Sequence, residues 1–321
     1  MPAPTDYRRP ERGCPVDIRS ALKLGIARLR AEGVPSDTLA AELLLLHATN
    51  RSRTSLYSHP EDALSDVERE TYFELIEKRA GGTPTQHLTG KQEFWGLPIE
   101  VTPEVLIPRP ETEHLVEVAL DRLALADLRA KGVQNMTGEG LLVADIGTGS
   151  GCIAVALAKE LPQATIYAAD VSRAALAVAE RNASRLGFAG QIHCVLSNLL
   201  SAFSAGWPEA LPAPAAHGWL FDLIVSNPPY IGRREAAELP REVREHEPEL
   251  ALFGGEEGYE LYAHLVSESA AHLEPGGILV LELGHDSLPA VRPLFDSPEW
   301  TGVGVTADLA GIPRVLAAER T

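Results

Sequence analysis

From residue 141 onward the chain alternates between short apolar runs and longer segments in which apolar residues recur every three or four positions. Short apolar runs indicate buried strands, and recurrence at three or four positions indicates helices. The expected strands cover residues 141–146, 165–169, 191–196, 221–226, 278–283, 302–307 and 314–318. The expected helices cover residues 153–160, 174–186, 259–273 and 287–295. Since strands separated by helices form a parallel sheet covered on both faces, we expect an α/β fold with a doubly wound, mostly parallel, seven-stranded sheet.

The first eighty residues carry helical patterns instead. Asp17 can cap a helix, and the apolar residues that follow it recur at helical spacing. Ser65 and Glu68 match a capping box that opens a later helix, which ends at Gly81-Gly82. We therefore expect residues 1–82 to form a small helical bundle.

Between residues 83 and 109 the pattern changes to period two around Phe94-Trp95-Gly96-Leu97, which is typical of a turn between two strands. These residues are expected to form a β-hairpin linker. Pro108-Arg109-Pro110 ends the strand pattern, because proline removes a backbone donor and restricts the residue before it, and Pro110 then opens a helix. The third domain is expected over residues 110–321, with a loop over residues 201–218.

The charge of the chain narrows the choice of partners. It has 28 Lys and Arg residues against 45 Asp and Glu residues, a formal net charge of −17. Nucleic-acid binding depends on basic side chains that neutralise phosphates, and a strongly negative protein is repelled by nucleic acids and anionic membranes. We expect no stable nucleic-acid partner and no membrane association.

The three cysteines, Cys14, Cys152 and Cys194, are far apart and form no metal-binding or redox pair. The histidines also lack metal-ligand spacing, so we expect no metal site. The amino-terminal residues have no apolar core of the kind found in signal peptides, and the most apolar stretch, residues 39–48, is too short to span a bilayer. The sequence predicts a cytoplasmic protein.

A glycine-rich segment, Gly147-Thr148-Gly149-Ser150-Gly151, stands between an expected strand and an expected helix. Glycines at this point allow a tight turn and close approach of a ligand to the backbone. The dinucleotide fingerprint would need a glycine where Cys152 stands, and the Gly-Lys-Ser/Thr ending of a phosphate-binding loop is missing. We expect these five residues to bind a ligand that contains an adenosine but no phosphate.

Two aspartates accompany this segment. Asp170 ends the next expected strand, where its carboxylate can accept hydrogen bonds from two ribose hydroxyls. The alternative is that Asp170 only caps the helix that begins near Ser172. For Asp145, which precedes the glycines, ligand binding and stabilisation of the loop both stay open.

Asn227-Pro228-Pro229-Tyr230 follows the expected strand over residues 221–226, at the strand end where open α/β sheets place their chemistry. Each residue before a proline is held extended, and the two prolines lack backbone donors. The Asn227 side-chain oxygen and the Pro228 carbonyl can therefore accept the two hydrogens of a planar NH₂ group, with the Tyr230 ring against its flat face. Such a corner selects an amide or a nucleobase amino group; the alternative is a simple proline turn.

At these residues the chain resembles the class I S-adenosylmethionine-dependent methyltransferases, and more closely the peptide chain release factor glutamine methyltransferases of the HemK/PrmC family. Asn-Pro-Pro-Tyr by itself is shared with adenine-N6 and guanine-N2 nucleic-acid methyltransferases, whereas Ile-Pro-Arg-Pro-Glu-Thr-Glu is more specific. The matching segments are residues 94–97, 105–113, 145–151, 227–230, 247–248, 254–255 and 275–284.

The resemblance implies a Rossmann-like methyltransferase domain that transfers a methyl group from S-adenosyl-L-methionine to the glutamine amide nitrogen in the Gly-Gly-Gln loop of release factors. It also implies that the helical residues 1–82 form a substrate-recognition domain that helps to hold the release factor. It implies that Gly147 to Gly151 line the methionine part of the cofactor, that Asp170 binds the ribose, and that Leu199 contacts the adenine. Catalysis would rest on Asn227, Pro228 and Tyr230, with Pro229 in the same substrate-binding corner and Asn227 also beside the cofactor. The chain departs from the family at Asn198-Leu199, where an acidic residue and an aromatic one are usual.

Three other functions compete with this interpretation. A nucleic-acid methyltransferase could use the same corner on adenine or guanine, although the net charge argues against it. A dinucleotide oxidoreductase would have to tolerate Cys152 in its fingerprint. An inactive interaction module could retain the fold without turnover. No histidine or carboxylate stands out as a general base, so position and electrostatics are expected to carry the reaction.

Overall fold

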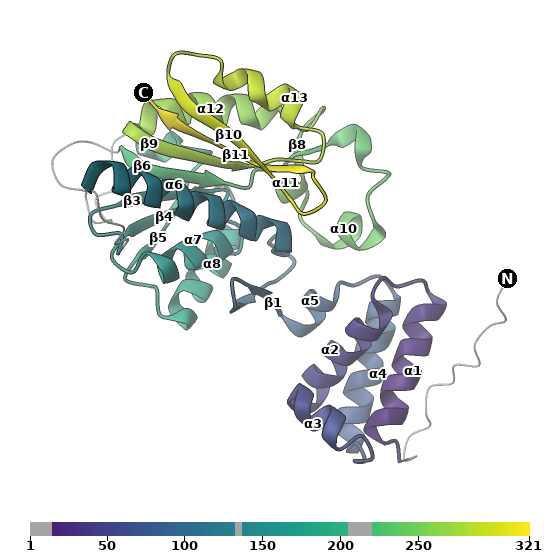
Figure 1. Ribbon diagram of the computed structural model, residues 1–321. Coiled ribbons are helices and arrows are strands. Elements are labelled where there is room, and N and C mark those ends of the chain that lie inside the picture. Colours follow the sequence, from purple (N-terminus) through teal and green to yellow (C-terminus); the bar gives the residue numbers. More distant parts are fainter. Residues whose placement is uncertain (1–14, 132–136, 205–219) are drawn as a thin grey trace. The chain divides into compact units, whose positions relative to one another are not determined.

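The computed structural model describes residues 15–131, 137–204 and 220–321, and these fall into two compact units (Figure 1). The smaller unit contains the chain up to Lys91 together with Pro240–His246, and the larger unit contains Gln92–Leu239 and Glu247–Thr321. The structure groups the hairpin with the larger unit, and it groups Pro240–His246, which lies in the predicted third domain, with the helices. The domain boundaries predicted from the sequence stay predictions.

The smaller unit is helical, as predicted. Its helices are α1 (Ile18–Ala31), α2 (Asp37–Thr49), α3 (Arg53–Ser58), α4 (Asp66–Ala80), α5 (Thr85–Thr89) and α10 (Arg241–His246). Asp17 caps α1 by accepting from the Ser20 backbone N–H at 2.7 Å, and the capping box of Ser65 and Glu68 opens α4. Both predicted helix starts are confirmed. The strand pattern expected from residue 83 is wrong at α5, where the chain forms a helical turn after Pro84 and leaves it at Gly90 with a φ of 72°.

Helix α10 belongs to this unit through a buried ion pair. Arg79 on α4 is 5% exposed, and its Nη2 donates to the Glu242 carboxylate on α10 at 2.6 Å. Arg79 also donates to the Thr83 carbonyl. Because these partners are 163 residues apart, local sequence pattern gave no sign of the pairing.

The packing of α1 against α4 requires a glycine within a helix. A Cβ atom added to Gly25 would lie 2.0 Å from the Tyr72 hydroxyl, and the Tyr72 side chain is fully buried. Gly25→Ala should lower the free energy of unfolding by about 1–2 kcal/mol, because overpacking at so short a distance costs about 2–3 kcal/mol and alanine returns about 1 kcal/mol of helix propensity. Urea unfolding of the full chain measures this difference. Adding Tyr72→Phe should recover part of the loss, and a Gly25→Ala variant as stable as the parent would contradict the packing argument.

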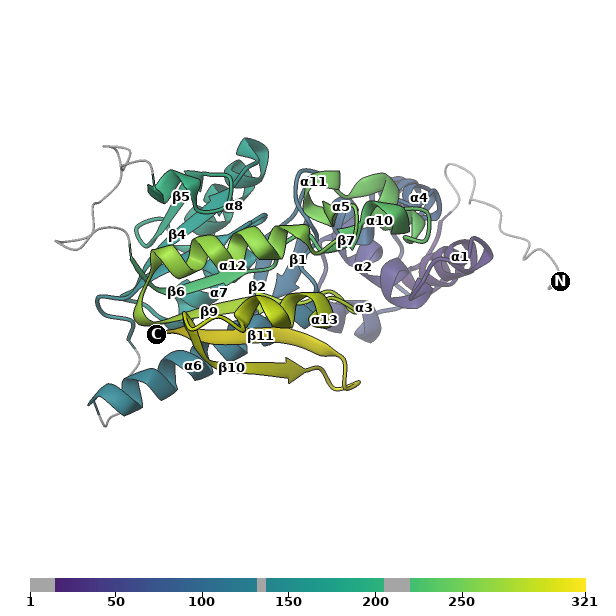
Figure 2. The same ribbon diagram turned by 90° about the horizontal axis from the view of Figure 1, so that it is seen from above.

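The larger unit is built on a seven-stranded sheet in the order β10-β11-β9-β6-β3-β4-β5. The strands are β3 (Leu142–Ile146), β4 (Thr165–Asp170), β5 (Ile192–Leu196), β6 (Phe221–Ser226), β9 (Leu273–Glu282), β10 (Trp300–Ala307) and β11 (Pro313–Arg320). Strand β11 pairs antiparallel with both of its neighbours, and the other pairings are parallel. Strands β5 and β10 lie at opposite edges, as Figure 2 shows from above. The predicted mostly parallel, seven-stranded sheet is confirmed.

Helices cover both faces of this sheet, because successive residues of each strand point to opposite sides. They are α6 (Glu113–Lys131), α7 (Cys152–Glu160), α8 (Arg173–Leu186), α12 (Glu260–His272) and α13 (Leu288–Val291). Val143 and Val225 belong to the core that contains the apolar residues of α6, α7 and α8. Ala144 and Ile224, one position away, belong to the core that contains those of α12 and α13. The doubly wound arrangement is therefore confirmed.

The hairpin consists of β1 (Lys91–Phe94) and β2 (Leu97–Glu100). Trp95 and Gly96 form its turn with φ angles of 54° and 67°, as a tight hairpin requires. Phe94 is buried in the core beneath α6, α7 and α8, and the side chain of Asn182 on α8 bonds both backbone groups of Glu100, accepting at 2.7 Å and donating at 3.0 Å. The hairpin is thus part of the larger unit.

The segment between β6 and α12 contains short elements that the sequence analysis did not expect. They are β7 (Ile231–Gly232), η2 (Arg233–Glu235), α11 (Glu249–Leu252) and β8 (Phe253–Gly255). Further short elements are η1 (Pro110–Thr112), α9 (Ser201–Ser204) and η3 (Arg292–Phe295). Helix α9 occupies the start of the loop predicted over residues 201–218, the rest of which lies outside the described residues. Within the described ranges, no helix combines the length and apolar character needed to cross a bilayer.

Candidate active site

The sheet order brings the predicted site residues together at the carboxyl ends of the central strands. The chain moves from β3 outward to β4 and β5 and then returns to the other side of β3 with β6, so the direction reverses between β3 and β6. Open α/β sheets bind ligands in the crevice outside the carboxyl ends of the strands at such a point. A cavity of about 610 Å³ is lined there by residues that follow β3, β4, β5 and β6, and its volume is ordinary for a small-molecule site.

The cavity separates the predicted site residues into two groups. Its lining includes Gly147, Gly149, Asp170, Leu199, Asn227 and Pro229. The predicted residues outside its lining are Thr148, Ser150, Gly151, Pro228 and Tyr230. The glycine loop and the Asn-Pro-Pro-Tyr corner therefore meet around one cavity, although not with every residue that the sequence pattern suggested.

Each glycine of the loop has a left-handed backbone conformation, in which a residue with a side chain would be strained. The φ angles of Gly147, Gly149 and Gly151 are 75°, 55° and 78°. A Cβ atom on Gly147 or Gly149 would meet no protein atom within 4 Å, whereas one on Gly151 would lie 3.0 Å from the Ala179 Cβ on α8. The first two glycines leave their backbone open to a ligand, and the third allows close packing of two helices.

Four of the five backbone N–H groups of this loop bond to the protein itself. Those of Gly147 and Thr148 both donate to the Ala169 carbonyl, that of Gly149 donates to the Asp170 carboxylate at 2.9 Å, and that of Gly151 donates to the Thr148 carbonyl. Phosphate-binding loops instead direct such groups at the ligand. This arrangement supports the expectation of a ligand without phosphate.

Thr148 and Asp145 stabilise the loop from within. The Thr148 hydroxyl donates to Asp145 Oδ2 at 2.6 Å, and the Ala154 N–H donates to the same oxygen at 3.1 Å. Asp145 is fully buried, which raises the pKa of its carboxyl to about 7. Of the two roles left open for Asp145, the structure supports the loop-stabilising one. Ser150 is also buried, and its carbonyl accepts from the Asn182 side chain at 2.9 Å.

Asp170 is held so that both of its carboxylate oxygens keep capacity for a ligand. Oδ1 accepts from the Ser172 N–H at 2.8 Å and Oδ2 accepts from the Gly149 N–H, which leaves each oxygen a further acceptor site. Helix α8 is capped by Ser172, whose hydroxyl accepts from the Ala175 N–H, so the alternative role of Asp170 as the cap is not observed. Burial raises the pKa of Asp170 despite these two hydrogen bonds.

Leu199 lines the cavity in an unusual conformation. Its φ is 49°, which is rare for a residue other than glycine. The Ser197 hydroxyl donates to the Leu199 carbonyl at 2.7 Å, and the Leu200 N–H donates to the Glu268 carboxylate at 2.9 Å. These two bonds hold the segment after β5 and place an apolar side chain at the cavity wall.

Asn227 and Tyr230 differ in their exposure to the cavity. Asn227 lines it and donates from Nδ2 to the Thr112 hydroxyl oxygen at 3.2 Å. The Tyr230 ring packs against Gly284, where a Cβ atom would lie 2.8 Å from the ring, and burial raises the pKa of Tyr230 to about 12. Pro228 is buried. The predicted contact of the Tyr230 ring with a planar ligand group stays a prediction.

The cavity also has lining residues that the sequence analysis did not single out. They include Glu104, Arg233, Leu250, Phe253 and His264. The Arg233 guanidinium lies 5.0 Å from the centre of the Phe253 ring, and Leu250 is 70% exposed although it borders the cavity. Arg233, Leu250 and Phe253 come from the short elements after β6, whose path depends on tertiary packing rather than on periodicity. Glu104 follows β2, and His264 lies on α12.

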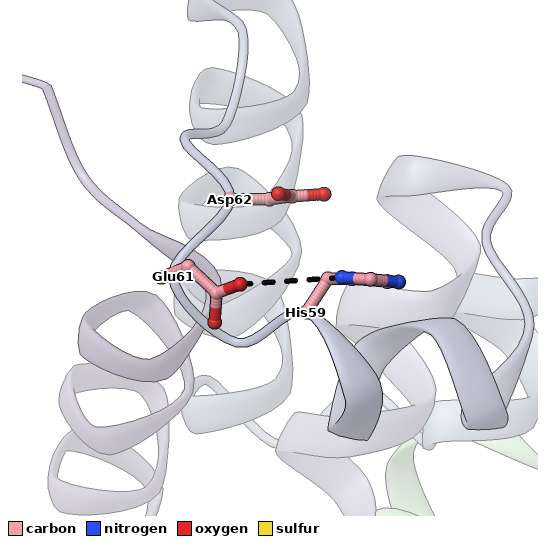
Figure 3. A group of neighbouring side chains, drawn as sticks. All are labelled: His59, Glu61 and Asp62. Atoms are coloured by element: carbon pink, nitrogen blue, oxygen red, sulfur yellow. Dashed lines mark ion pairs between the residues drawn. The ribbon is translucent and has the colours of Figure 1, made fainter.

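One group of side chains has spacing compatible with a metal ion among the described residues: His59, Glu61 and Asp62 (Figure 3). All three are exposed, and His59 Nδ1 lies 4.0 Å from Glu61 Oε1. Asp62 accepts from Arg51 at 2.9 Å. Exposed acidic groups of this kind are common without an ion, and this group gives no reason to assign a metal.

Comparison with known proteins matches both parts of the chain. A family model described as the PrmC N-terminal domain matches residues 20–90, and one described as the methyltransferase small domain matches residues 130–243. A release factor glutamine methyltransferase from Koribacter versatilis is 40% identical over 303 residues, which is 94% of this chain and 98% of the relative. One from Moorella thermoacetica is 39% identical over 304 residues, with the same coverage. The solved structure of the hMettl16 catalytic domain with an RNA hairpin has a TM-score of 0.50 and 19% identity, covering 76% of this chain and 81% of that one, a similarity of fold alone.

Proposed function

Because the chain belongs to the release factor glutamine methyltransferase family, we propose that it transfers a methyl group from S-adenosyl-L-methionine to the glutamine side-chain amide in the Gly-Gly-Gln motif of peptide chain release factors. The observation that carries this proposal is the meeting of two features around one cavity: Asp170 beside the glycine loop, and Asn227 at the end of β6. One feature suits an adenosine cofactor, and the other suits a planar NH₂ group.

The cavity residues fit the cofactor in their chemistry. Gly147 and Gly149 leave open backbone for its methionine part, Asp170 offers two acceptor sites for the ribose hydroxyls, and Leu199 offers an apolar surface for the adenine. When bound, S-adenosyl-L-methionine supplies a methyl group made electrophilic by a sulfonium. A carboxylate-lined cavity suits this cationic group better than it suits a phosphate.

The lone pair of an amide nitrogen is delocalised, so the nitrogen is a poor nucleophile. The protein therefore contributes by positioning the substrate amide and by electrostatic stabilisation. Asn227 Oδ1 and the Pro228 carbonyl accept the two N–H groups of the substrate glutamine and increase the electron density on its nitrogen. They also hold that nitrogen in line with the methyl group, and such alignment can contribute about 7–11 kcal/mol in favourable cases. The nitrogen gains the methyl group as the bond between that carbon and the sulfonium sulfur breaks and leaves its electron pair on sulfur. The nitrogen then loses one proton to water, which restores a neutral amide.

Membership of the same family also suggests the protein substrate, a release factor. A net charge of −17 suits a protein substrate better than a nucleic acid, so the nucleic-acid methyltransferase alternative is not favoured. The helical unit, matched by the family's N-terminal domain, helps to hold the release factor. Since release factors act in translation termination, the enzyme works in the cytoplasm.

A labelling experiment tests this function directly. Purified protein is incubated with methyl-labelled S-adenosyl-L-methionine and a cognate release factor, either unchanged or with the glutamine of Gly-Gly-Gln replaced by alanine. Label should appear on the unchanged release factor alone. Label on neither protein would contradict the proposal, and label on added RNA instead would favour the nucleic-acid alternative.

Leu199 provides a test of the adenine contact. Leu199→Gly should weaken S-adenosyl-L-methionine binding about five- to tenfold, because part of an apolar side chain leaves the cavity wall. The free energy of unfolding should stay within about 1 kcal/mol of the parent, since glycine adopts the left-handed backbone without strain. Calorimetric titration gives the affinity, and Leu199→Ala, which keeps the strain and loses the contact, is the matched variant. Unchanged affinity in both would place the adenine elsewhere.

A further inference from the structure

Three residues from the short elements after β6 stand where the cavity opens to solvent. They are Arg233 in η2, Leu250 in α11 and Phe253 in β8, and all three line the cavity. Arg233 is exposed, Leu250 is 70% exposed and Phe253 is half-buried. Because lining residues that are also exposed mark an opening, we call these three residues the cavity mouth.

Backbone contacts join the cavity mouth to the Asn-Pro-Pro-Tyr corner. Strand β7 follows Tyr230 directly and pairs in parallel with β8, with Ile231 opposite Phe253. Gly254 lies against the corner itself, because a Cβ atom added there would overlap the Pro229 carbonyl oxygen. A residue without a side chain allows this approach. A substrate whose amide reaches the corner therefore has its neighbouring atoms close to the mouth.

The Arg233 guanidinium is held in place and still keeps most of its hydrogen-bonding capacity. It lies 5.0 Å from the centre of the Phe253 ring, and its Nη1 lies 3.5 Å from the Glu249 carboxylate. A guanidinium has five N–H groups in a fixed plane. Among the described residues, the bond to Glu249 is the one hydrogen bond that the Arg233 side chain donates. A planar cation stacked on a ring thus presents open donors at the mouth.

We propose that Arg233 is a specificity-determining residue that binds backbone carbonyl oxygens of the peptide segment around the target glutamine, with Phe253 and Leu250 as the apolar surface beside that segment. This inference rests on the proposed function. A glutamine side chain that reaches Asn227 leaves its own backbone at the mouth, because the substrate is a folded protein too large for the cavity. The two glycines of Gly-Gly-Gln lack side chains, so their carbonyl groups can approach a flat guanidinium closely.

The charges around the mouth favour peptide carbonyl groups over phosphates as the acceptors. The Arg233 charge is balanced by Glu249, and the cavity lining also contains three carboxylates, those of Glu104, Asp170 and Glu260. These carboxylates would repel a phosphodiester, whereas a carbonyl group carries no net charge. The contribution of Arg233 to substrate binding should therefore change little between low and high salt, since strong salt dependence is the mark of a phosphate ligand.

Steady-state kinetics of two matched variants tests the proposal. Arg233→Met keeps a long side chain and loses the donors, so the KM for the release factor should rise about tenfold or more, while kcat at saturation stays within about threefold of the parent. The dissociation constant of S-adenosyl-L-methionine should not change. Arg234→Met is the control, because the Arg234 side chain is 58% exposed against 56% for Arg233 and pairs with Glu257, yet lies outside the cavity lining. Its KM should stay within about twofold of the parent.

The substrate side provides a second measurement. The release factor is titrated calorimetrically into the enzyme with S-adenosyl-L-homocysteine, which has no methyl group to transfer. Replacing the glycine before the target glutamine by alanine should weaken binding to the parent enzyme about fivefold or more and should change binding to Arg233→Met far less, since both changes remove the same contact. Equal weakening with both enzymes would separate the glycine from Arg233 and contradict the proposal.

The outcomes separate this inference from the proposed function. If the release factor binds with an affinity that depends on Arg233 but is not methylated, the proposed function fails and the recognition by Arg233 stands. If methylation occurs with an unchanged KM in Arg233→Met, the function stands and the inference fails. Weaker cofactor binding in Arg233→Met, equal damage in Arg234→Met, or a loss that vanishes at high salt would each overturn the inference. A release factor that is neither bound nor methylated would contradict both.

Discussion

Asn227→Ala should reduce methyl transfer by about a thousandfold or more while the dissociation constant of S-adenosyl-L-methionine stays within about threefold of the parent value. In the proposed mechanism, the side chain supplies one of two acceptors for the substrate amide and helps to align its nitrogen. Both contributions are made to the reacting group, so their loss falls on kcat. The proposed cofactor contacts with the glycine loop and Asp170 should be unaffected, since these residues stand at the ends of β3 and β4.

Single-turnover kinetics and a separate cofactor titration measure the two quantities. Thermal unfolding of Asn227→Ala should resemble that of the parent, because the side chain is only partly buried and makes a single hydrogen bond, to Thr112. Asn227→Asp is the matched variant: it retains an acceptor but cannot donate to Thr112, and it should remain impaired. Loss of turnover and of cofactor affinity together would remove Asn227 from the role assigned to it.

Asp170→Ala should produce the opposite pattern. The dissociation constant of S-adenosyl-L-methionine should rise about a hundredfold or more, because each hydrogen bond from a ribose hydroxyl to a carboxylate is worth about 1.5–3 kcal/mol. The Gly149 and Ser172 N–H groups also lose their acceptor, which loosens the loop. At saturating cofactor, kcat should return to within about tenfold of the parent, since Asp170 does not touch the substrate amide.

The pH dependence of binding gives an independent check. The carboxylate must be ionised to accept from two hydroxyls, and burial raises the pKa of Asp170. Affinity should therefore weaken as the pH falls through this raised value, and Asp170→Ala should lose that dependence. An Asp170→Ala variant that binds the cofactor as tightly as the parent would show that the ribose lies elsewhere.

The sequence by itself determined the main helices and sheet strands and the two motifs that contribute to the cavity lining. Strand and helix periodicity, the capping box at Ser65, and the turn at Trp95-Gly96 are local, so each could be predicted from neighbouring residues. The positions of the glycine loop and of Asn227 followed as well, because both stand at carboxyl ends of parallel strands. The family resemblance then supplied the reaction, which the relatives support.

The tertiary structure decided which side chains face the cavity and what stands behind them. Thr148 and Ser150 belong to the predicted glycine loop, but they do not line the cavity. Instead they form hydrogen bonds with Asp145 and Asn182. The Asn227 amide meets Thr112 across 115 residues of sequence. Hydrophobic periodicity indicates which face of a helix or strand is buried. Pairing between buried polar groups depends on the order of strands in the sheet, which no local pattern contains.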